Sequence, residues 1–427
     1  MARQMKDAGV KWIGDIPAEW DTIRFKFLHN GLNTGEAIDK EFWSDDINDT
    51  IFYTAGLLPI HTTFTDFPEW KYTTENDLLL ARNGTPYVYY PVSKSCYTDH
   101  IIRATIKEQV CKKFLQYSLQ QSISSVTVSQ VSIATWSASL WNEQTIPFPS
   151  LDEQKKIADY LDKKCAEIDT VITKTKATIE EYKKLKQSVI TEAVTKGIRG
   201  NRPMKDSGID WIGEIPSEWE IIPFRYALKE REEKNSPIKS TERLSLSIDL
   251  GVTLYAEKTT NLDRFKDDFE QYKLAHIGDL VMNSMNMIVG ATGVSKYDGC
   301  VSPAYYTFYD EVEDHITARY CEYIFRSKTM LRVLYSLGKG IYAIVRGDDR
   351  VNTCRLKVSK EDLKSIKIPF PCIDEQRKIV TYLDQKCAEI DTLIAKKTAL
   401  LEEMETYKKS VIYEYVTGKK EVNDING

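Results

Sequence analysis

Residues 146–170 read IPFPSLDEQKKIADYLDKKCAEIDT, and residues 368–392 read IPFPCIDEQRKIVTYLDQKCAEIDT, with 19 of 25 positions identical. A shorter pair precedes these two stretches along the chain. Residues 5–20 read MKDAGVKWIGDIPAEW, and residues 204–219 read MKDSGIDWIGEIPSEW, with 11 of 16 positions identical. Self-similarity on this scale indicates a chain built from two copies of one structural unit.

The spacing of the two pairs separates a duplicated frame from two inserts. The shorter motifs are 199 residues apart and the longer motifs 222, so the second insert is 23 residues longer than the first. The inserts cover residues 21–145 and 220–367, and they have diverged while the frame has stayed almost unchanged. This pattern predicts one molecule that carries out the same kind of task twice, on two different targets.

Each longer motif is expected to open a long helix. In the first copy, the spacing from Ser150 to Glu153 fits a capping box that follows two prolines. The second copy has Cys372 in place of the serine, so its cap must rely on Asp374 or on water. Each helix is free of Gly and Pro until Gly197 or Gly418, and about 45 residues give a rod of roughly 65–70 Å.

A heptad pattern runs along both helices, because apolar residues recur at alternating spacings of four and three. The expected seam residues are Leu161, Ile168, Ile172, Ile179, Leu383, Ile390, Ile394 and Leu401. A long helix with one apolar stripe needs a partner. The tandem repeat favours pairing with the other copy, hence an antiparallel coiled coil. The alternative, in which each helix packs only on its own domain, is less favoured because the stripe is too long for one small domain to cover.

The inserts read as α+β domains of roughly 125–150 residues. The first has strand-like runs at 77–82, 87–92 and 101–106 before a helical stretch at 110–122. The second has runs at 279–284 and 305–309 before a helical stretch at 317–336. The fold class predicted is therefore α+β, with two similar globular domains joined by two long helices in a pseudo-two-fold repeat. The domain boundaries expected are 1–150, helix 151–198, 199–371, helix 372–418 and a tail at 419–427.

Composition excludes several classes of protein. The chain has 427 residues, of which 42% are hydrophobic and 11% aromatic, so it is not disordered. No apolar run approaches the roughly 18 residues of a membrane helix, and residues 1–20, which have early charges and no apolar core, are not expected to be a signal peptide. Eight scattered cysteines without a C-x-x-C pair indicate reduced thiols in the cytoplasm. Cys165 and Cys387, at matching repeat positions, are expected to be small buried residues.

Polar loop residues that could read DNA bases occur in both inserts. Arg pairs with guanine through two hydrogen bonds, and Asn or Gln pairs with adenine in the same way. The candidates are Arg82, Asn83, Thr85, Ser129, Gln130, Asn283, Asn286, Lys339, Tyr342, Arg346 and Arg350. For any one of them, an ordinary solvated loop side chain is an equally good interpretation, so the hypothesis rests on the clusters. A net charge of −5 counts against nucleic-acid binding, although only the face that meets phosphate has to be positive.

Aromatic pairs and missing motifs narrow the function further. The paired tryptophans at 12 and 20, and at 211 and 219, could stack on bases, but packing of the shorter motif onto its domain is the favoured interpretation. The chain has no P-loop, no Asn/Asp-Pro-Pro-aromatic motif of an amino-methyltransferase, no glycine-rich turn for S-adenosylmethionine and no spaced metal-ligand set. Catalysis is therefore expected in partners.

The repeated motifs resemble those of the specificity subunits of type I restriction–modification systems. The carrying motifs are the Ile-Pro-x-Glu-Trp stretches at 16–20 and 215–219, together with the Ile-Pro-Phe-Pro-x-x-Asp-Glu-Gln-(Lys/Arg)-Lys-Ile runs at 146–157 and 368–379. The resemblance implies that each insert reads half of a split site in double-stranded DNA, and that the coiled coil acts as a ruler. It also implies two modification methyltransferase subunits and restriction/translocase subunits as partners. These partners would hold S-adenosylmethionine, ATP and Mg²⁺ and would flip the target adenines.

Two other functions remain as alternatives. A protein-only coiled-coil scaffold with two adhesive domains fits the acidic charge but not the divergent, loop-rich inserts. A self-contained methyltransferase or nuclease lacks its motifs. On the ruler hypothesis, changing the helix length by about one turn should change the tolerated spacer between the half-sites.

Overall fold

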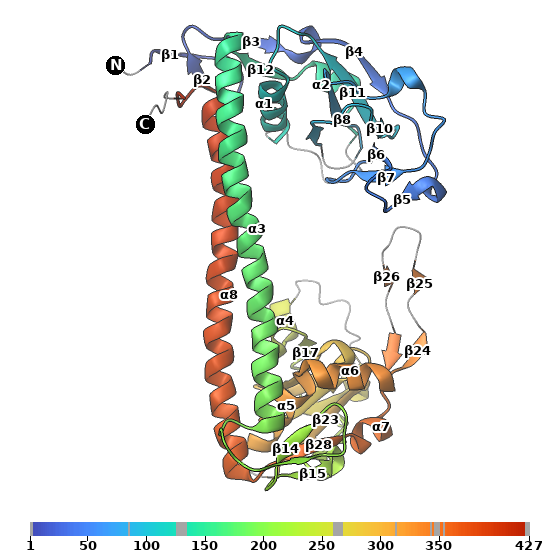
Figure 1. Ribbon diagram of the computed structural model, residues 1–427. Coiled ribbons are helices and arrows are strands. Elements are labelled where there is room, and N and C mark those ends of the chain that lie inside the picture. The colour runs from blue at the N-terminus through green and yellow to red at the C-terminus, as the bar shows by residue number, and fades with distance from the viewer. Residues whose placement is uncertain are drawn as a thin grey trace. The chain divides into compact units, whose positions relative to one another are not determined.

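Two long helices organise the computed structural model of the chain, which describes residues 3–83, 86–124, 135–258, 268–311, 314–341, 344–345, 351–352 and 355–422. Helix α3 spans Leu151–Lys196 and helix α8 spans Ile373–Val416 (Figure 1). Gly197 and Gly418 follow the helix ends with φ angles of 74° and 69°, the left-handed conformation that commonly ends a helix. The predicted helices, 151–198 and 372–418, therefore lie within two residues of the observed ones.

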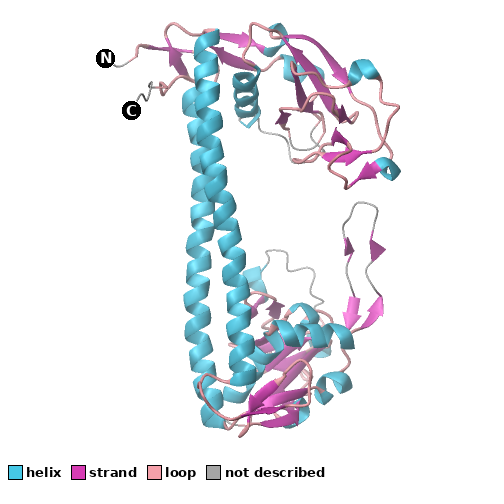
Figure 2. Ribbon diagram, in the orientation of Figure 1, coloured by secondary structure: helices cyan, strands magenta, loops and turns pink. Residues whose placement is uncertain are grey.

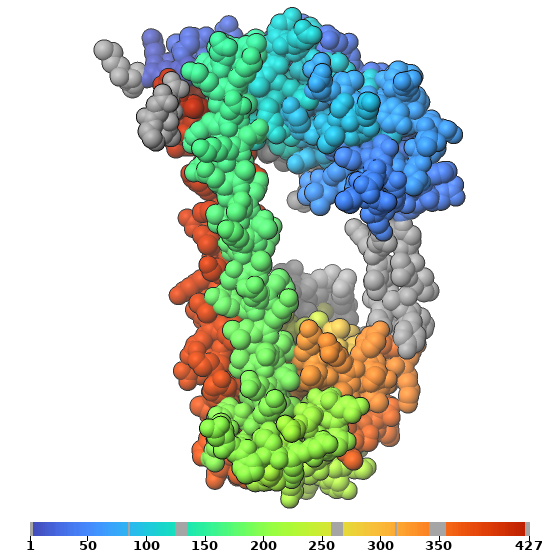
Figure 3. Space-filling view, viewed as in Figure 1, coloured from blue at the N-terminus to red at the C-terminus, as the bar shows by residue number. Residues whose placement is uncertain are grey.

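Each long helix contributes to two compact units. The first unit comprises Met1–Lys176 with Ala399–Gly427, and the second comprises Ala177–Thr398. In the space-filling view, the green α3 and the red α8 lie against each other (Figure 3). The first unit contains residues 151–176 of α3 and 399–416 of α8, and the second unit contains the rest of each helix.

Ion pairs between the two helices show an antiparallel arrangement with two-fold character. In the first unit, Lys408 Nζ of α8 lies 2.6 and 2.7 Å from the carboxylate oxygens of Asp169 in α3. In the second unit, Lys186 Nζ of α3 lies 2.7 Å from both carboxylate oxygens of Asp391 in α8. The repeat offset of 222 residues converts one pair into the other with the helices exchanged. The predicted antiparallel pairing is confirmed.

Most residues of the predicted seam are buried. Its buried members are Leu161, Ile168, Ile172, Ile179, Leu383 and Ile390. Cys165 and Cys387 are buried as expected. Ile394 and Leu401 are only half-buried, and Ile394 borders an open groove of about 1000 Å³ in the second unit.

The capping prediction is confirmed for the side chain of Ser150 and is wrong for Asp374. Ser150 Oγ accepts the backbone N–H of Glu153 at 3.4 Å, but the glutamate does not reach back to complete the box. In the second copy, the carbonyl of Cys372 accepts the first helical N–H groups, and Asp374 pairs with Arg377 instead of capping. The glutamates of the two motifs have another role, because they hold the frame together.

The shorter and longer motifs of each repeat fold against each other through that glutamate. In the first unit, the indole Nε1 of Trp20 donates to Glu153 Oε2 at 2.7 Å, and Arg3 Nη2 donates to Glu153 Oε1 at 2.7 Å. The Arg3 guanidinium also lies over the Trp20 ring, 5.2 Å from its centroid. One carboxylate thus satisfies an indole and a guanidinium at the start of α3.

The second unit repeats this contact in a more buried setting. Trp219 Nε1 donates to Glu375 Oε2 at 3.0 Å, and Arg202 Nη1 donates to Glu375 Oε1 at 2.5 Å. The side chains of Arg202 and Glu375 are 9% and 7% exposed, against 22% and 27% for Arg3 and Glu153. This contact was not predicted from the sequence, although the co-occurrence of the two motifs in both repeats was a signal for it.

The C-terminal ends of the long helices pack on the shorter motifs. Val416 near the end of α8 clusters with Ile13, Ile16 and Trp20 in the first unit. In the second unit, the end of α3 packs in the same way on the motif at 204–219. The last helix of the chain therefore closes onto its first motif, just as α3 closes onto the second.

Both inserts contain the same four-stranded antiparallel sheet. The first sheet has the order β4-β11-β8-β9, and its strands are His29–Thr34, Ile101–Ile106, Asp77–Ala81 and Val88–Tyr89. The second has the order β16-β23-β20-β21, and its strands are Lys229–Glu230, Tyr305–Tyr309, Leu280–Asn283 and Thr292–Val294. The equivalent strands occur in the same sequence order, so the inserts share a fold despite their divergence.

Helices and smaller sheets complete each domain (Figure 2). The first domain adds α1 (Lys112–Ser124) and α2 (Ala138–Asn142). It also contains the pair β12-β3 (Thr145–Phe148 and Asp21–Arg24) and the sheet β10-β6-β7-β5 (Cys96–Tyr97, Thr50–Tyr53, Ile60–Thr62 and Trp43–Ser44). The second adds α4 (Tyr255–Lys258), α5 (Ile316–Arg326), α6 (Lys328–Leu337), α7 (Lys360–Ser365) and several two-stranded sheets. This mixture of segregated helices and antiparallel strands confirms the predicted α+β class.

Two element predictions needed correction. The helical stretch expected at 317–336 is broken at Ser327, whose hydroxyl donates to Ile324 O at 2.7 Å and accepts the N–H of Met330 at 3.4 Å. One serine thus ends α5 and caps α6. The strand expected at 87–92 is reduced to Val88–Tyr89, because Pro91 has no N–H to extend the ladder.

Candidate nucleic-acid interface

In both domains, a strand leads from a buried aspartate to candidate DNA-reading residues. Asp77, at the start of β8, is 0% exposed, and Asp279, just before β20, is 1% exposed. Each carboxylate accepts the backbone N–H of the residue three positions earlier, Thr74 at 2.7 Å and His276 at 2.8 Å. The acidic turn that the inserts share therefore has a structural role, since it fixes where the strand begins.

The carboxylate of Asp77 is saturated by neighbouring hydroxyl groups. Thr105 Oγ1 donates to Asp77 Oδ1 at 2.6 Å, and Thr74 Oγ1 donates to Asp77 Oδ2 at 2.9 Å. Arg103 Nε lies 3.9 Å away and compensates the buried charge. These bonds join the start of β8 to the adjacent strand β11.

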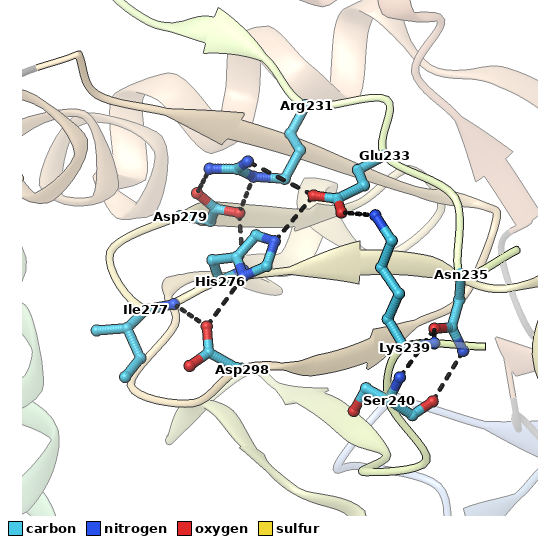
Figure 4. A network of polar contacts seen from close by, with 9 residues as sticks. All are labelled: Arg231, Glu233, Asn235, Lys239, Ser240, His276, Ile277, Asp279 and Asp298. Atoms are coloured by element: carbon cyan, nitrogen blue, oxygen red, sulfur yellow. Dashed lines mark hydrogen bonds and ion pairs between the residues drawn. The ribbon is translucent and has the colours of Figure 1, made fainter. Parts of the chain in front are cut away.

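Asp279 is held by a different partner, Arg231 (Figure 4). Arg231 Nε lies 2.6 Å from Asp279 Oδ2 and Arg231 Nη2 lies 3.0 Å from Oδ1, which is a bidentate pair. Because β16 precedes Arg231 directly, this pair connects the edge strand to the start of β20. The two domains thus stabilise the same strand with different side chains.

The network continues through His276, which lies between two carboxylates (Figure 4). Its Nε2 is 2.9 Å from Glu233 Oε2 and its Nδ1 is 3.0 Å from Asp298 Oδ1. Lys239 Nζ also donates to Glu233 Oε1 at 2.6 Å. The hydrogen bond from Lys239, followed by that from His276, lowers the pKa of Glu233 to about 2. The charged groups of this network are paired with one another. We therefore assign the network a structural role, which is to make the domain rigid, and not a catalytic one.

Arg82 and Asn83 follow β8, and the backbone of Arg82 is hydrogen-bonded to neighbouring segments on both sides. The N–H of Arg82 donates to His100 O at 2.8 Å, and its carbonyl accepts the N–H of Trp136 at 2.6 Å. The Arg82 side chain is exposed. Asn83 Nδ2 lies 2.7 Å from His100 Nδ1 and can donate to it. The two residues are therefore presented from a rigid strand end.

The equivalent strand β20 ends in a turn that Asn283 stabilises. Asn283 is 6% exposed, and its Oδ1 accepts the backbone N–H groups of Met285 at 3.0 Å and Asn286 at 3.4 Å. Asn286 itself is exposed. Within this pair of candidates, Asn283 shapes the turn while Asn286 is available to a ligand.

Lys339 lies at the base of a hairpin formed by β24 (Lys339–Ile341) and β27 (Arg355–Lys357). It forms an exposed ion pair with Asp362 at 3.0 Å. Lys273, Lys339, Lys357 and Lys360 line a pocket of about 460 Å³ here. Burial, and then the like charge of Lys360, lowers the pKa of Lys273. Lys339 is paired with Asp362 and Lys360 with Glu230 and Glu232, so carboxylates already balance part of the positive charge of this pocket.

The other candidates lie outside the described residues. They are Thr85, Ser129, Gln130, Tyr342, Arg346 and Arg350. Tyr342, Arg346 and Arg350 belong to the segment between β24 and β27 along the chain.

The tryptophans pack within the domains, as the favoured interpretation expected. Trp20 and Trp219 are each 1% exposed. Trp12 is half-buried and donates from Nε1 to Thr145 O at 3.0 Å. Trp20 and Trp219 are therefore too buried to stack on bases in this conformation.

In the part of the chain that the structure describes, no helix has the length and apolar character needed to cross a membrane. No group of three or more His, Cys, Asp or Glu side chains there could hold a metal ion.

A family model matches most of the chain in two segments, one in each repeat. The family is described as the type I restriction modification DNA specificity domain, and its matches cover residues 17–181 and 265–403. The chain belongs to this family. The resemblance inferred from the two motifs is confirmed, and so is the prediction of a non-catalytic specificity subunit that recognises DNA.

Relatives are similar over much or all of their length. The specificity subunit of type I restriction enzyme MjaVIII from Methanocaldococcus jannaschii is 24% identical over 431 residues, covering 96% of this chain and 95% of that protein. A protein from the same archaeon, provisionally described as the MjaX specificity subunit, is 23% identical over 324 residues, which is 72% of this chain and 65% of that protein. The EcoDI specificity subunit of Escherichia coli is 20% identical, covering 95% of this chain and 90% of that protein.

One solved structure supports the fold. It comes from work on complex assembly and conformational transition of the type I R-M system, and it aligns with a TM-score of 0.64 at 14% identity. The alignment covers 95% of this chain and 99% of that one. The two-domain, two-helix architecture is therefore shared by proteins of low sequence identity.

Proposed function

We propose that this chain reads a bipartite DNA target, each insert recognising one half, and that it carries the modification and restriction subunits of a type I complex. One observation carries the proposal. The same four-stranded sheet occurs twice on a duplicated frame, and different side chains follow the same strand. Arg82 and Asn83 follow β8, whereas Asn286 follows β20.

The candidates that follow β8 and β20, together with nearby lysines, have the chemistry needed for two kinds of DNA contact. An arginine such as Arg82 suits guanine, and amides such as Asn83 and Asn286 suit adenine. Lys273 of β19 (Lys273–Ala275) and Lys357 of β27 line one pocket, and they suit phosphates, which position a protein without reading sequence. The net charge of −5 does not oppose this, because only the contacting face has to be positive.

The paired helices would act as a ruler between the two half-sites. Helices of 46 and 44 residues have lengths of roughly 65–70 Å. Two weak readers joined by a stiff element gain affinity from effective concentration only when the half-sites have the matching separation.

Catalysis would belong to the partner subunits. The repeated frame offers two equivalent places, so we infer two modification methyltransferase subunits, which bind S-adenosylmethionine and flip the target adenines. Restriction/translocase subunits would bind and use ATP and Mg²⁺. The relatives' description as specificity subunits of type I restriction enzymes supports this assignment.

Methylation mapping tests the proposal. Genomic DNA would be compared between cells with and without this chain, with the partner methyltransferase present in both. We expect adenine methylation at one split motif to disappear when the chain is deleted. An unchanged methylation pattern in cells that contain the assembled complex would contradict the proposal.

A change in helix length tests the ruler. Inserting one heptad after Lys176 in α3 and one before Ala399 in α8 preserves the seam and adds roughly 10 Å. At 3.4 Å per base pair, the preferred spacer should lengthen by about three base pairs. A heptad inserted in the tail after Lys420 is the matched control. An unchanged spacer in the helix variant would contradict the ruler while leaving DNA recognition intact.

A further inference from the structure

In the first unit, the insert meets its long helix through a tyrosine and a lysine that share one carboxylate. Tyr117 of α1 donates its hydroxyl to Asp162 Oδ1 of α3 at 2.7 Å. Lys113 Nζ, one helical turn earlier, lies 3.3 Å from the same oxygen. Both side chains lie on one face of α1, because residues four apart are neighbours on a helix.

We call this tyrosine–aspartate hydrogen bond, with its adjacent cation, the joint. The second unit contains an equivalent joint. Tyr323 of α5 donates its hydroxyl to Asp384 Oδ1 of α8 at 2.7 Å. Arg319 Nη2 lies 2.5 Å from that oxygen. Asp384 and Asp162 are repeat equivalents, since they are 222 residues apart.

The inserts keep this joint although their helices have diverged. Aligning residues 112–120 with 318–326 leaves one identity in nine positions, and it is Tyr117 with Tyr323. Lys113 and Arg319 preserve the positive charge. No other side chain in these stretches is shared, so the joint is the feature that the two insert helices have in common.

The phenol of each tyrosine is partly buried. Burial, and then the hydrogen bond to the aspartate, raises the pKa of Tyr117 and of Tyr323. The carboxylates stay partly exposed, with side-chain exposures of 47% for Asp162 and 37% for Asp384, and the cations beside them are 30% (Lys113) and 43% (Arg319) exposed. A short hydrogen bond to a charged acceptor is directional, so it fixes orientation better than a partly exposed ion pair does.

We propose that Tyr117–Asp162 and Tyr323–Asp384 are positioning residues that set the angle of each target-recognition domain on the helical frame. This inference rests on the proposed DNA-reading function, and it goes beyond that function by naming the residues that hold the half-site readers in register. A joint that only stabilised the fold would change the melting temperature but leave the preferred spacer unchanged.

The first test measures orientation without DNA. Spin labels on unnatural amino acids would replace the exposed residues Lys328 and Leu393 of the second unit in the full chain. Tyr323→Phe with Asp384→Asn should broaden the distribution of distances between the labels. Arg319→Lys, which copies the first repeat, should leave the distribution narrow. An equally narrow distribution in both variants would overturn the proposal.

The second test measures register on DNA with the assembled methyltransferase complex. A hydrogen bond to a charged group changes an equilibrium by about tenfold or more. The preference for the native spacer over spacers one base pair longer or shorter should therefore fall by about tenfold in the Tyr323→Phe, Asp384→Asn variant. The half-site sequences should stay the same. Uniform loss of binding with the spacer preference retained would overturn the proposal.

The two tests separate failure of the joint from failure of the function. If the wild-type complex methylated no split site but the label distances still broadened, the DNA-reading proposal would fail and the structural part of the joint would stand. Tyr117→Phe with Asp162→Asn provides the mirror experiment. It should leave the distances in the second unit unchanged, and a broadening there would contradict a joint that acts within its own unit.

Discussion

Replacing Glu375 by alanine should destabilise the protein much more than replacing its repeat equivalent, Glu153. Each glutamate accepts hydrogen bonds from one tryptophan and one arginine. The pair of Glu375 with Arg202 is nearly sealed from water, with side-chain exposures of 7% and 9%. The corresponding side chains in the first unit, Glu153 and Arg3, are 27% and 22% exposed, so water can replace a lost partner there.

The expected loss of stability depends on which polar groups each substitution leaves without a hydrogen-bond partner. Removing one member of a buried pair costs about 3–5 kcal/mol. Arg202 keeps Glu218 at 3.1 Å and Lys196 O at 2.7 Å, which places Glu375→Ala near 3 kcal/mol. In the first unit, Arg3 also keeps Glu19, so Glu153→Ala should cost about 1 kcal/mol. A gap of about 2 kcal/mol corresponds to roughly a thirtyfold difference in the unfolding equilibrium.

Urea denaturation, followed by circular dichroism and tryptophan fluorescence, measures both losses. Glu375→Gln, which keeps an acceptor for the Trp219 indole, should recover part of the loss. Asp374→Ala is the matched control, because its pair with Arg377 is exposed and should contribute less than about 0.5 kcal/mol. Equal losses for the two glutamates, or a loss below about 1 kcal/mol for Glu375→Ala, would refute the reasoning.

Three further predictions concern packing, hydrogen bonding and pH. Gly418→Ala should cost about 2–4 kcal/mol in a urea titration, because a Cβ there would lie 2.5 Å from Pro17 Cδ at a φ of 69°. Gly9→Ala, at a similar φ with nothing within 4 Å, should cost only about 1 kcal/mol, and equal costs would contradict this packing. Tyr320→Phe should cost about 1–2 kcal/mol, because the buried hydroxyl donates to the carbonyl oxygens of Val194 and Pro369, each at 3.2 Å. An unchanged urea midpoint would argue against those bonds. The pKa of Glu233 is lowered to about 2, so its stabilisation is present above about pH 4.5 and disappears as the pH falls towards 2. Glu233→Gln should therefore flatten the stability profile across that range, and an unaltered slope would contradict the assignment.

Much of the site could not be predicted from composition and motif alone. Asn283 and Asn286 look equivalent in sequence, yet one carboxamide is occupied by a turn and the other is exposed. Asp77 and Asp279 look like polar loop residues, yet both are buried. Burial and hydrogen-bond partners depend on strands distant in sequence, such as β11 for Asp77, and local pattern contains no information about them.

The sequence by itself determined the repeat, the helix bounds and the antiparallel seam. Helical periodicity and helix-stopping residues are local properties, and a duplicated frame requires two equivalent arrangements. It also determined the family, because the two motifs that carry the resemblance lie in the frame and not in the divergent inserts.

Only the tertiary structure decided how the motifs and inserts are held. The contacts of Trp20 with Glu153 and of Tyr117 with Asp162 join residues far apart in the chain. The break at Ser327 likewise became visible only when its hydroxyl was found to end one helix and cap the next. A hydrogen bond between distant residues depends on distance and direction in space, and periodicity along the chain specifies neither.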